Sequence, residues 1–213
     1  MNVTVFGATG AIGQQVVQQL RSHGHAVTAY VRNPGKVPAS WGQDVTVVTG
    51  EITDAAAIDR AVAGADAVVS ALGPSMDRKA TGLPLVEGTQ HIVAAMQRHG
   101  VRRYVGNATP SVLDPREKGT WQTRLPTAMA KTFLRRAYDE ITGMSQAVMD
   151  SGLDWTLVRF TAPKDGAAKG RLRVGFFGTD KVGMAVTRAD IAAFTAAQVD
   201  DARYLKAAPA ISN

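Results

Sequence analysis

The sequence contains no cysteine, so disulfide bonds, thiol catalysis and cysteine-ligated metal sites are excluded. It also lacks an apolar run of the length that crosses a bilayer. Its first residues enter a strand pattern at once, without the basic and then apolar leader of an exported protein. We therefore expect a cytoplasmic protein that has no membrane partner.

Internal repeats and low-complexity linkers are absent as well. The 213 residues suit a single domain, 1–213, with enough length for a substantial core. With 45% hydrophobic and 20% charged residues, the composition is typical of a soluble globular chain.

The net charge is +6, and many of the bases lie between positions 116 and 136. That stretch has one acid, Glu117, and six bases: Arg116, Lys118, Arg124, Lys131, Arg135 and Arg136. Such a run is either a solvated face or a guide for an anionic substrate. We expect no nucleic-acid partner, because helix-turn-helix, zinc and RNA-binding signatures are missing.

A glycine-rich turn is the most informative feature that is present. An apolar strand pattern at 3–6 runs into Gly7-Ala8-Thr9-Gly10-Ala11-Ile12-Gly13, and a helical pattern follows at 14–21. Free amides and the positive end of the helix favour a diphosphate there, and glycines let its oxygens approach the backbone. The triplet alone also suits an ordinary turn, but its position between strand and helix favours a dinucleotide site through Gly7, Thr9, Gly10, Ala11, Ile12 and Gly13.

Strand and helix patterns alternate along the rest of the chain. Strands are expected at 27–31, 45–48, 67–72, 103–107 and 155–159, with helices at 55–63, 85–99 and within 132–150. This alternation predicts an α/β Rossmann fold with a doubly wound parallel sheet. Residues 110–126 form the longest stretch without a regular pattern, which is typical of a lid or binding loop.

The tail after Phe160 has a different pattern and predicts a short C-terminal extension, 160–213, over the carboxyl edge of the sheet. We expect a loop at 161–166, a short strand at 172–174, a helix at 191–199 that is capped by 187–190, and a last strand at 204–206.

The end of the second strand indicates which dinucleotide is bound. Enzymes that prefer NAD usually place an acid there for the ribose 2′-hydroxyl, whereas this strand is followed by Arg32. An arginine pairs with a 2′-phosphate and predicts NADP(H), although a surface arginine is the alternative. Glu51 and Ile52 after the third strand are expected at the adenine, and Ala71, Leu72 and Gly73 after the fourth strand at the ribose and diphosphate.

The chain resembles a known family over nearly its whole length. The resemblance rests on the glycine turn, on Val31-Arg32-Asn33-Pro34, and on the segments 64–68, 151–159 and 211–213. The sequence is similar to the atypical short-chain dehydrogenase/reductases, within them to the NAD(P)H-binding, NmrA-like group and especially to biliverdin reductase B-type flavin reductases. The resemblance implies a Rossmann sheet, NADP(H), and reduction of flavins, quinones or linear tetrapyrroles. It also implies that Asn107, Ala108, Thr109 and Ser111 lie beside the nicotinamide.

The Tyr-x-x-x-Lys pair of classical short-chain dehydrogenases is missing. The residues four places after Tyr30, Tyr104, Tyr138 and Tyr204 are Pro34, Ala108, Thr142 and Ala208. Reduction of a simple ketone through that pair is therefore not expected, whereas a conjugated acceptor needs less help. Thr109 and Ser111 are the catalytic candidates for orienting the acceptor, unless they only cap a turn beside Pro110. Trp121 either stacks on a flat substrate or packs, and the four histidines predict no metal site.

Two functions remain open from the sequence. The first is an NADPH-dependent reductase that transfers hydride to an anionic flavin-, quinone- or tetrapyrrole-like acceptor. The second is a non-catalytic NADP(H)-binding redox sensor of the NmrA-like type. A nucleotide-sugar epimerase or dehydratase is disfavoured, because it needs the tyrosine–lysine pair and a larger substrate domain. We expect a monomer or a homodimer.

Overall fold

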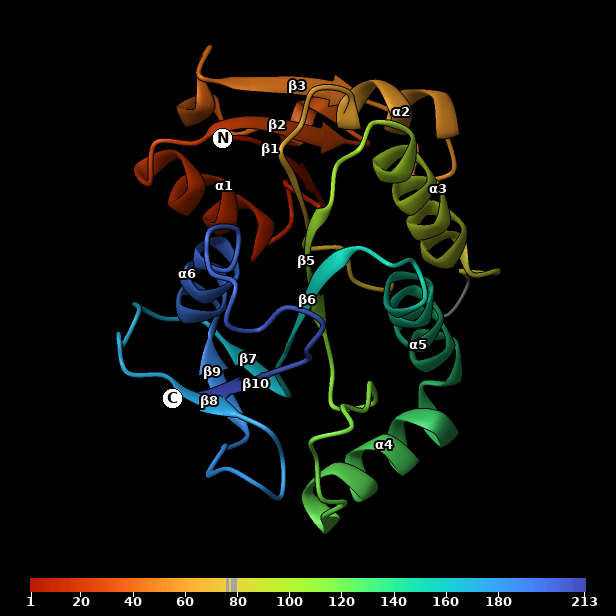
Figure 1. Cartoon of the computed structure of the whole chain (residues 1–213), viewed down its shortest axis with the longest axis vertical. Coiled ribbons are helices and arrows are strands. Elements are labelled where there is room, and N and C mark those ends of the chain that lie inside the picture. The colour runs from red at the N-terminus through yellow and green to blue at the C-terminus, as the bar shows by residue number, and fades with distance from the viewer. Residues whose placement is uncertain (76, 78–79) are drawn as a thin grey trace.

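The computed structural model describes residues 1–75, 77 and 80–213, except the side chains of residues 121, 122, 124 and 126 (Figure 1). Within these residues, eight strands form one sheet in the order β3-β2-β1-β4-β5-β6-β10-β8. Seven of them run parallel and β8 is antiparallel to β10. The order 3-2-1-4-5-6 is that of the doubly wound nucleotide-binding fold, so the predicted fold class is confirmed.

The elements follow the sequence patterns closely in the first half of the chain. The strands of the sheet are β1 (Asn2–Phe6), β2 (Ala26–Val31), β3 (Val45–Thr49), β4 (Ala67–Ser70), β5 (Arg103–Ala108), β6 (Asp154–Arg159), β8 (Arg173–Gly175) and β10 (Ala210–Ser212). The helices are α1 (Gly13–Ser22), α2 (Ala55–Val62), α3 (Pro84–Arg98), α4 (Trp121–Phe133), α5 (Arg135–Met149) and α6 (Arg188–Ala197).

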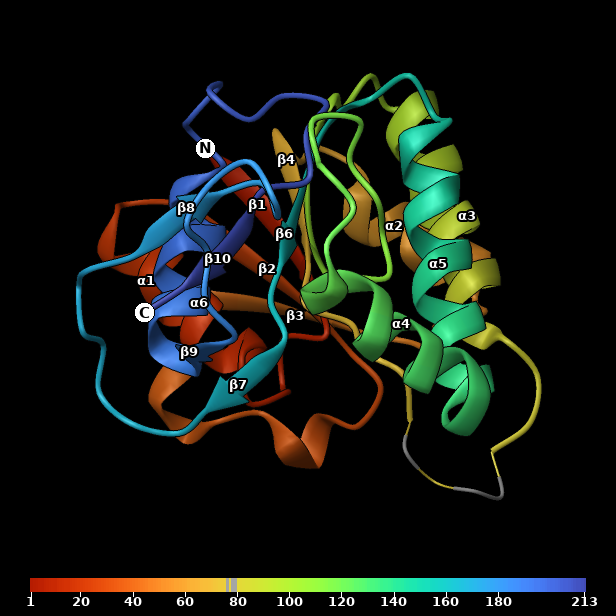
Figure 2. The same ribbon diagram turned by 90° about the horizontal axis from the view of Figure 1, so that it is seen from below.

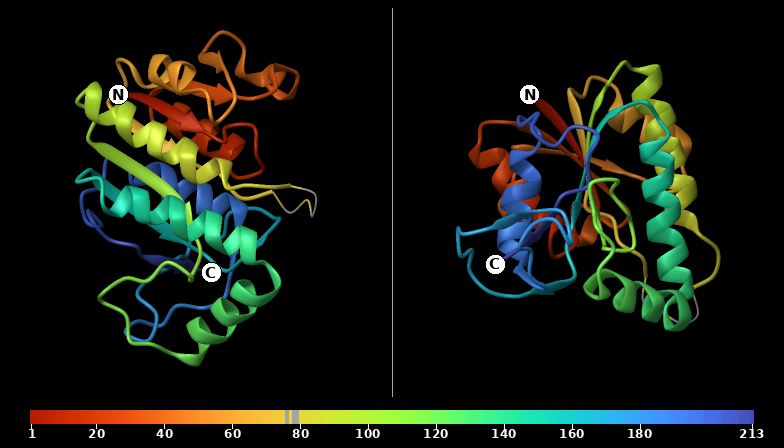
Figure 3. Two further views of the ribbon diagram at one scale, coloured as in Figure 1. Left: turned by 90° about the vertical axis from the view of Figure 1, so that its right-hand side faces the viewer. Right: turned by 60° about the horizontal axis from the view of Figure 1, so that its bottom comes forward.

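The sheet is the middle of three layers. Helices α1 and α6 cover one face, and α2, α3 and α5 cover the other (Figures 2 and 3). Each face has its own apolar core, in which Leu20 of α1 and Ile191 of α6 share one cluster, and Ile58 of α2 and Met96 of α3 share the other. The central strands are buried on both sides, which explains their continuous apolar runs.

The C-terminal tail joins the sheet. β10 pairs with β6, and β8 pairs with β10 as the last strand. The predicted strand at 204–206 is wrong, because this segment is a turn in which Lys206 has a φ of +51°. Ala207 makes an isolated parallel bridge to Thr156 of β6, and the strand itself is β10, whose residues are all buried.

Two further expectations for irregular segments are corrected. Part of the predicted loop 161–166 is strand β7 (Ala162–Lys164), which pairs with β9 (Ala185–Thr187) in a separate two-stranded sheet. The stretch 110–126 is irregular only as far as residue 120, because α4 begins at Trp121 and continues through position 126. The proline at position 126 explains the wrong prediction, because a proline lacks the backbone N–H that a helix interior uses and therefore indicates an irregular segment.

Helix α6 also begins earlier than expected, at Arg188. The Thr187 side chain accepts a hydrogen bond from the Asp190 amide and caps the helix, as predicted. Within the described residues, none of the helices combines the length and the apolar character that a bilayer crossing requires.

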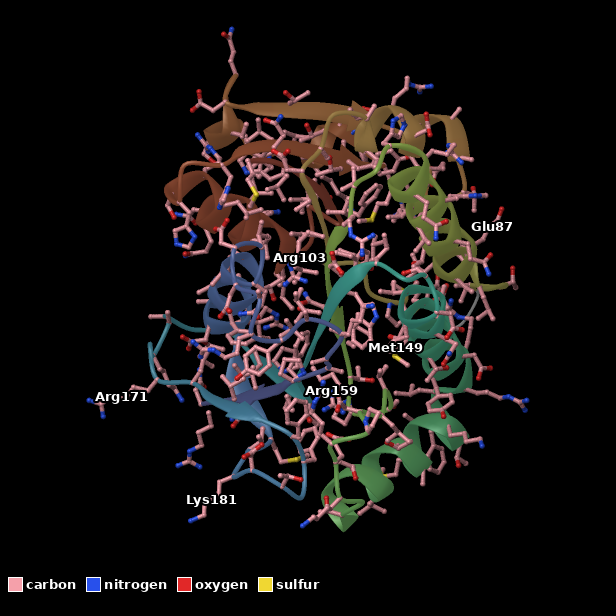
Figure 4. All side chains as sticks on the ribbon, viewed as in Figure 1. Glu87, Arg103, Met149, Arg159, Arg171 and Lys181 are labelled. Carbon is pink, nitrogen blue, oxygen red and sulfur yellow. The ribbon has the colours of Figure 1, made fainter. Side chains whose placement is uncertain are left out.

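A buried ion pair attaches the tail to the rest of the fold. Arg159 at the end of β6 is fully buried, and its Nη2 lies 2.6 Å from Oε1 of Glu117. Its other nitrogens donate to the carbonyl oxygens of Val112 at 2.7 Å and Ala208 at 2.6 Å, and its guanidinium lies 5.5 Å from the centre of the Phe177 ring. Figure 4 shows Arg159 among the inner side chains, whereas Arg171 and Lys181 point into solvent. One side chain therefore links β6 to the loop after β5 and to two segments of the tail.

We expect Arg159→Met to lower the free energy of unfolding by about 3–5 kcal/mol, because Glu117 would stay buried without its partner. The measurement is urea unfolding followed by circular dichroism. Arg171→Met, at an exposed arginine, is the matched control and should change stability by less than about 0.5 kcal/mol.

The double variant Arg159→Met/Glu117→Gln should recover part of the loss, because glutamine carries no charge and its oxygen still accepts the Phe177 amide hydrogen bond. A loss below about 1 kcal/mol for Arg159→Met alone would show that the pair does not hold the tail.

Candidate functional site

A cleft of about 370 Å³ lies at the carboxyl ends of β1, β2, β3 and β4. The strand order reverses at this point, because β2 and β3 lie on one side of β1 and β4 to β6 lie on the other. Ligands usually bind at such a reversal in open α/β folds. Nine predicted cofactor residues line it: Gly7, Thr9, Gly10, Arg32, Glu51, Ile52, Ala71, Leu72 and Gly73. Six further residues line it that were not among the predicted cofactor residues: Tyr30, Val31, Asn33, Lys36, Gly50 and Leu85.

The three glycines of the turn have different physical roles. Gly7 has a φ of +73°, and a Cβ on it would lie 2.8 Å from the Ala71 carbonyl carbon. A Cβ on Gly13 would lie 2.1 Å from the Gly7 oxygen, so α1 can approach the turn only without a side chain there. Gly10 is exposed at the cleft, and the contact that its Cβ would make is a looser one, 3.3 Å from the Gly7 oxygen.

The start of α1 presents unused amide donors. The Gly10 amide donates to the Gly7 oxygen and the Gln14 amide to the Gly10 oxygen. Among the described residues, no acceptor is found for the amides of Ala11, Ile12 and Gly13, and the first turn of α1 carries no acid. These three residues adjoin the cleft at the positive end of the helix, where an anion is stabilised.

Two cations lie at the other end of the cleft. Arg32 follows β2, and the Asn33 side chain accepts the Gly35 amide hydrogen bond and starts the short helix η1 (Pro34–Lys36). This turn brings Lys36 back to the cleft beside Arg32. Both side chains are exposed, and neither has a partner among the residues that the structure describes. The Asn-Pro-Gly turn after Arg32 is the sequence signal that would have revealed Lys36.

Tyr30 organises the floor of the cleft. Its hydroxyl donates to the Glu51 carbonyl oxygen at 2.7 Å, which fixes the turn after β3. Burial, together with the nearby charges of Asp54 and Glu51, raises the pKa of Tyr30 to about 12, so the hydroxyl stays a donor at neutral pH. The sequence pattern of β2 did not indicate this role, because Tyr30 occupies an ordinary core position of that strand.

The two catalytic candidates lie outside the residues that line this cleft. Thr109 and Ser111 follow β5, one strand beyond β4, and both are half-buried. The Val112 amide donates to the Thr109 oxygen, so Thr109 does begin a turn there. Their catalytic role stays a prediction, and the Trp121 side chain lies outside the described residues.

Asn107 and Ala108 are held by neighbouring elements. Asn107 Oδ1 accepts a hydrogen bond from the Thr195 hydroxyl at 3.1 Å, and the Ala108 oxygen accepts one from the Phe160 amide. One strand further along, Thr161 has a buried hydroxyl with no partner among the described residues. The carboxyl ends of β5 and β6 therefore bring three hydroxyls to the same edge of the sheet, of which the sequence indicated Thr109 and Ser111.

The other titratable groups give no relay of the classical kind. Tyr104 is fully buried, and burial raises its pKa to about 12. Thr142 occupies the position, four residues after Tyr138, at which the classical pair has its lysine. Its hydroxyl donates to the Tyr138 backbone carbonyl oxygen at 2.8 Å. In the described part of the chain, no three histidine, aspartate or glutamate side chains gather as a metal site.

Comparisons with known proteins agree with this geometry. The family model described as NAD(P)H-binding matches residues 7–202. A relative in Streptomyces griseus, (4-alkanoyl-5-oxo-2,5-dihydrofuran-3-yl)methyl phosphate reductase, is 33% identical over 157 residues, which cover 74% of this chain. The match covers 46% of that enzyme, so the chain spans less than half of its relative's length.

Two solved structures show the same fold. A short-chain dehydrogenase/reductase of Veillonella parvula in complex with NADP superposes with a TM-score of 0.79, covering 100% of this chain and 94% of that one at 18% identity. An anaerobillin reductase of Escherichia coli O157:H7 superposes with a TM-score of 0.77, covering 99% and 96% at 19% identity. The glycine turn, the cleft and the family match lead to one conclusion: this chain belongs to the NAD(P)H-binding family.

Proposed function

We propose that the protein is an NADPH-dependent oxidoreductase that passes a hydride to a conjugated, anionic acceptor of the flavin, quinone or tetrapyrrole class. The observation that carries the proposal is the cleft itself, which has free amides at one end and two unpaired cations at the other. NADPH supplies the hydride when it is bound.

The residues fit that cofactor segment by segment. Gly7, Gly10 and the amides at 11–13 would hold the diphosphate, since no side chain or acid blocks their approach. Arg32 and Lys36 would hold the 2′-phosphate through charge-assisted hydrogen bonds. Glu51 and Ile52 would border the adenine, and the segment 71–73 would border the ribose.

The acceptor is proposed to lie at the carboxyl ends of β5 and β6, next to this cleft along the sheet. Thr109, Ser111 and the unpartnered Thr161 hydroxyl would orient its polar atoms. The tyrosine–lysine pair that supplies the proton in classical members is missing from the sequence, which favours an acceptor whose added charge is delocalised. Holding two flat rings in register is then the main catalytic contribution of the protein. The reductase names of the relatives support this class of reaction.

A second candidate function is an NADP(H) sensor that carries out no chemistry. The observation in its favour is that Thr109 and Ser111 lie outside the cleft-lining residues. A sensor would bind the same cofactor with the same residues.

Turnover separates the two functions. We expect NADPH oxidation in the presence of at least one free flavin or quinone, followed as loss of absorbance at the reduced-nicotinamide band. Cofactor binding by calorimetry without oxidation across the whole panel would favour the sensor. The absence of both binding and oxidation would overturn both functions.

Cofactor preference tests the two cations. Arg32→Ala should weaken NADPH binding by about ten- to a hundredfold, which corresponds to the ~1.5–3 kcal/mol of a charged hydrogen bond, and should leave NADH almost unchanged. Lys36→Ala should act in the same direction, since its charge borders the same end of the cleft. Dissociation constants from calorimetry give the answer, with Arg171→Ala as the control. An unchanged ratio of NADPH to NADH affinity in the double variant would assign the cations another role.

The turn glycines separate binding from folding. Gly10→Ala should fold normally yet weaken NADP⁺ and NAD⁺ alike by about tenfold or more, because Gly10 lines the cleft and the added methyl group would crowd the proposed diphosphate position. Gly13→Ala should instead lower the free energy of unfolding by at least ~1–3 kcal/mol, because its Cβ meets the Gly7 oxygen. Thermal unfolding and calorimetry measure the two effects. Wild-type affinity in Gly10→Ala would argue against the diphosphate position.

A further inference from the structure

A buried carboxylate on α5 caps the start of α3. Glu140 is 1% exposed, and its Oε1 accepts a hydrogen bond from the Leu85 amide at 3.2 Å. The first turn of α3 needs such an acceptor, because Leu83 at the N-cap position makes no side-chain hydrogen bond and Pro84 has no amide hydrogen. Glu140 therefore acts as a cap that comes from 55 positions further along the chain.

Arg136 lies one turn before Glu140 on α5 and holds the segment that leads into α3. Its Nη1 lies 3.0 Å from Oε2 of Glu140, and its Nη2 donates to the Ser75 carbonyl oxygen. Ser75 follows shortly after Gly73, which lines the cofactor cleft. This one ion pair therefore contacts the chain twice, where it leaves the cleft after β4 and where it returns to the cleft at Leu85.

The start of α3 is part of the cleft wall, because Leu85 and Ile52 both line the cleft. A Cβ on Gly88 would lie 2.4 Å from Cγ1 of Ile52, so α3 rests directly on this second wall residue. Helix α5 also packs closely on α3, since a Cβ on Gly143 would lie 2.7 Å from Cγ2 of Val86 (Figures 1 and 3). A shift of α3 at its capped end would therefore displace Leu85 and its contact with Ile52 together.

We propose that Glu140 and Arg136 are positioning residues for the cofactor. They fix Leu85 and the segment after Gly73 at the part of the cleft where the adenine and its ribose are proposed to lie. Neither residue is among those that line the cleft, so both act through the backbone groups that they hold. The inference rests on the proposed function, because it requires that the cleft binds NADP(H). A pair that only joined α3 to α5 would affect stability and leave the affinity of the folded protein unchanged.

Substitutions at Glu140 separate positioning from stability. Glu140→Met removes the acceptor of the Leu85 amide and should raise the dissociation constant for NADP⁺ about tenfold, since the cleft wall loses the hydrogen bond that holds it in place. Glu140→Gln keeps an oxygen of the same reach and should stay within about threefold of the wild type. Calorimetry well below the unfolding temperature measures the affinity, and thermal unfolding measures the stability separately.

A cofactor fragment locates the effect. Glu140→Met should weaken adenosine 2′,5′-bisphosphate by the same factor as NADP⁺, because this fragment contains the adenine end alone. Asp59→Asn is the matched control, since Asp59 accepts a hydrogen bond from Nε of Arg98 at 3.0 Å at the opposite end of α3. This control should leave both dissociation constants unchanged.

A double variant keeps the test valid if Glu140→Met fails to fold. Arg136→Met together with Glu140→Gln leaves no buried charge without a partner and removes the hydrogen bond to the Ser75 oxygen. It should weaken NADP⁺ and adenosine 2′,5′-bisphosphate by about three- to tenfold.

Three results would overturn the proposal. The first is affinity for NADP⁺ within about twofold of the wild type in Glu140→Met or, where that variant does not fold, in the double variant. The second is a loss for NADP⁺ that the fragment does not share, which would place the effect elsewhere in the cleft. The third is an equal loss in Asp59→Asn, which would assign it to α3 as a whole. Wild-type protein that binds no NADP⁺ would instead overturn the proposed function, and this inference with it.

Discussion

The close approach of three backbone segments around Gly7 is the contact on which the site depends. The turn after β1 passes the end of β4 at a distance that leaves no room for a Cβ on Gly7, and the start of α1 closes on the same turn at Gly13. This packing brings the carboxyl ends of β1 and β4 together and directs the amides of α1 toward the space between them. The cleft exists because these two glycines have no side chains, whereas Gly10 only gives access to it.

The second organising interaction is the buried Arg159–Glu117 pair. A buried ion pair adds little net stability compared with an apolar contact, but removing one partner is costly. The contacts of Arg159 show which parts of the chain the pair connects. It joins β6 to the loop that carries Thr109 and Ser111 and, in the tail, to Phe177 and Ala208, so this loop and the tail are held together.

The two halves of the proposed catalytic site differ in how much the fold prescribes. The cofactor half is built from strand ends and from one helix terminus, and its donors and cations are set by local geometry. The proposed acceptor half is built from the loop after β5 and from Thr161 after β6, which come from distant parts of the chain.

The sequence by itself determined the Rossmann sheet, the glycine turn and the position of Arg32, because each of these rests on residues that are neighbours along the chain. Apolar runs predict buried parallel strands, glycines after a strand predict a tight turn, and an arginine directly after β2 points to the 2′-phosphate position. The predicted boundaries of most helices and strands in residues 1–107 agree with the structure to within about two residues for the same reason.

Only the tertiary structure decided the rest, because it depends on contacts between distant segments. Lys36 reaches the cleft through the η1 turn, Tyr30 acts through the Glu51 carbonyl 21 positions away, and β10 finds its place only beside β6. Helix α4 contains a proline and shows a weak apolar pattern, so packing against α5 and the tail decides that it is helical and which side it exposes. Local patterns specify elements and turns, whereas the partners of Arg159 follow from how those elements pack.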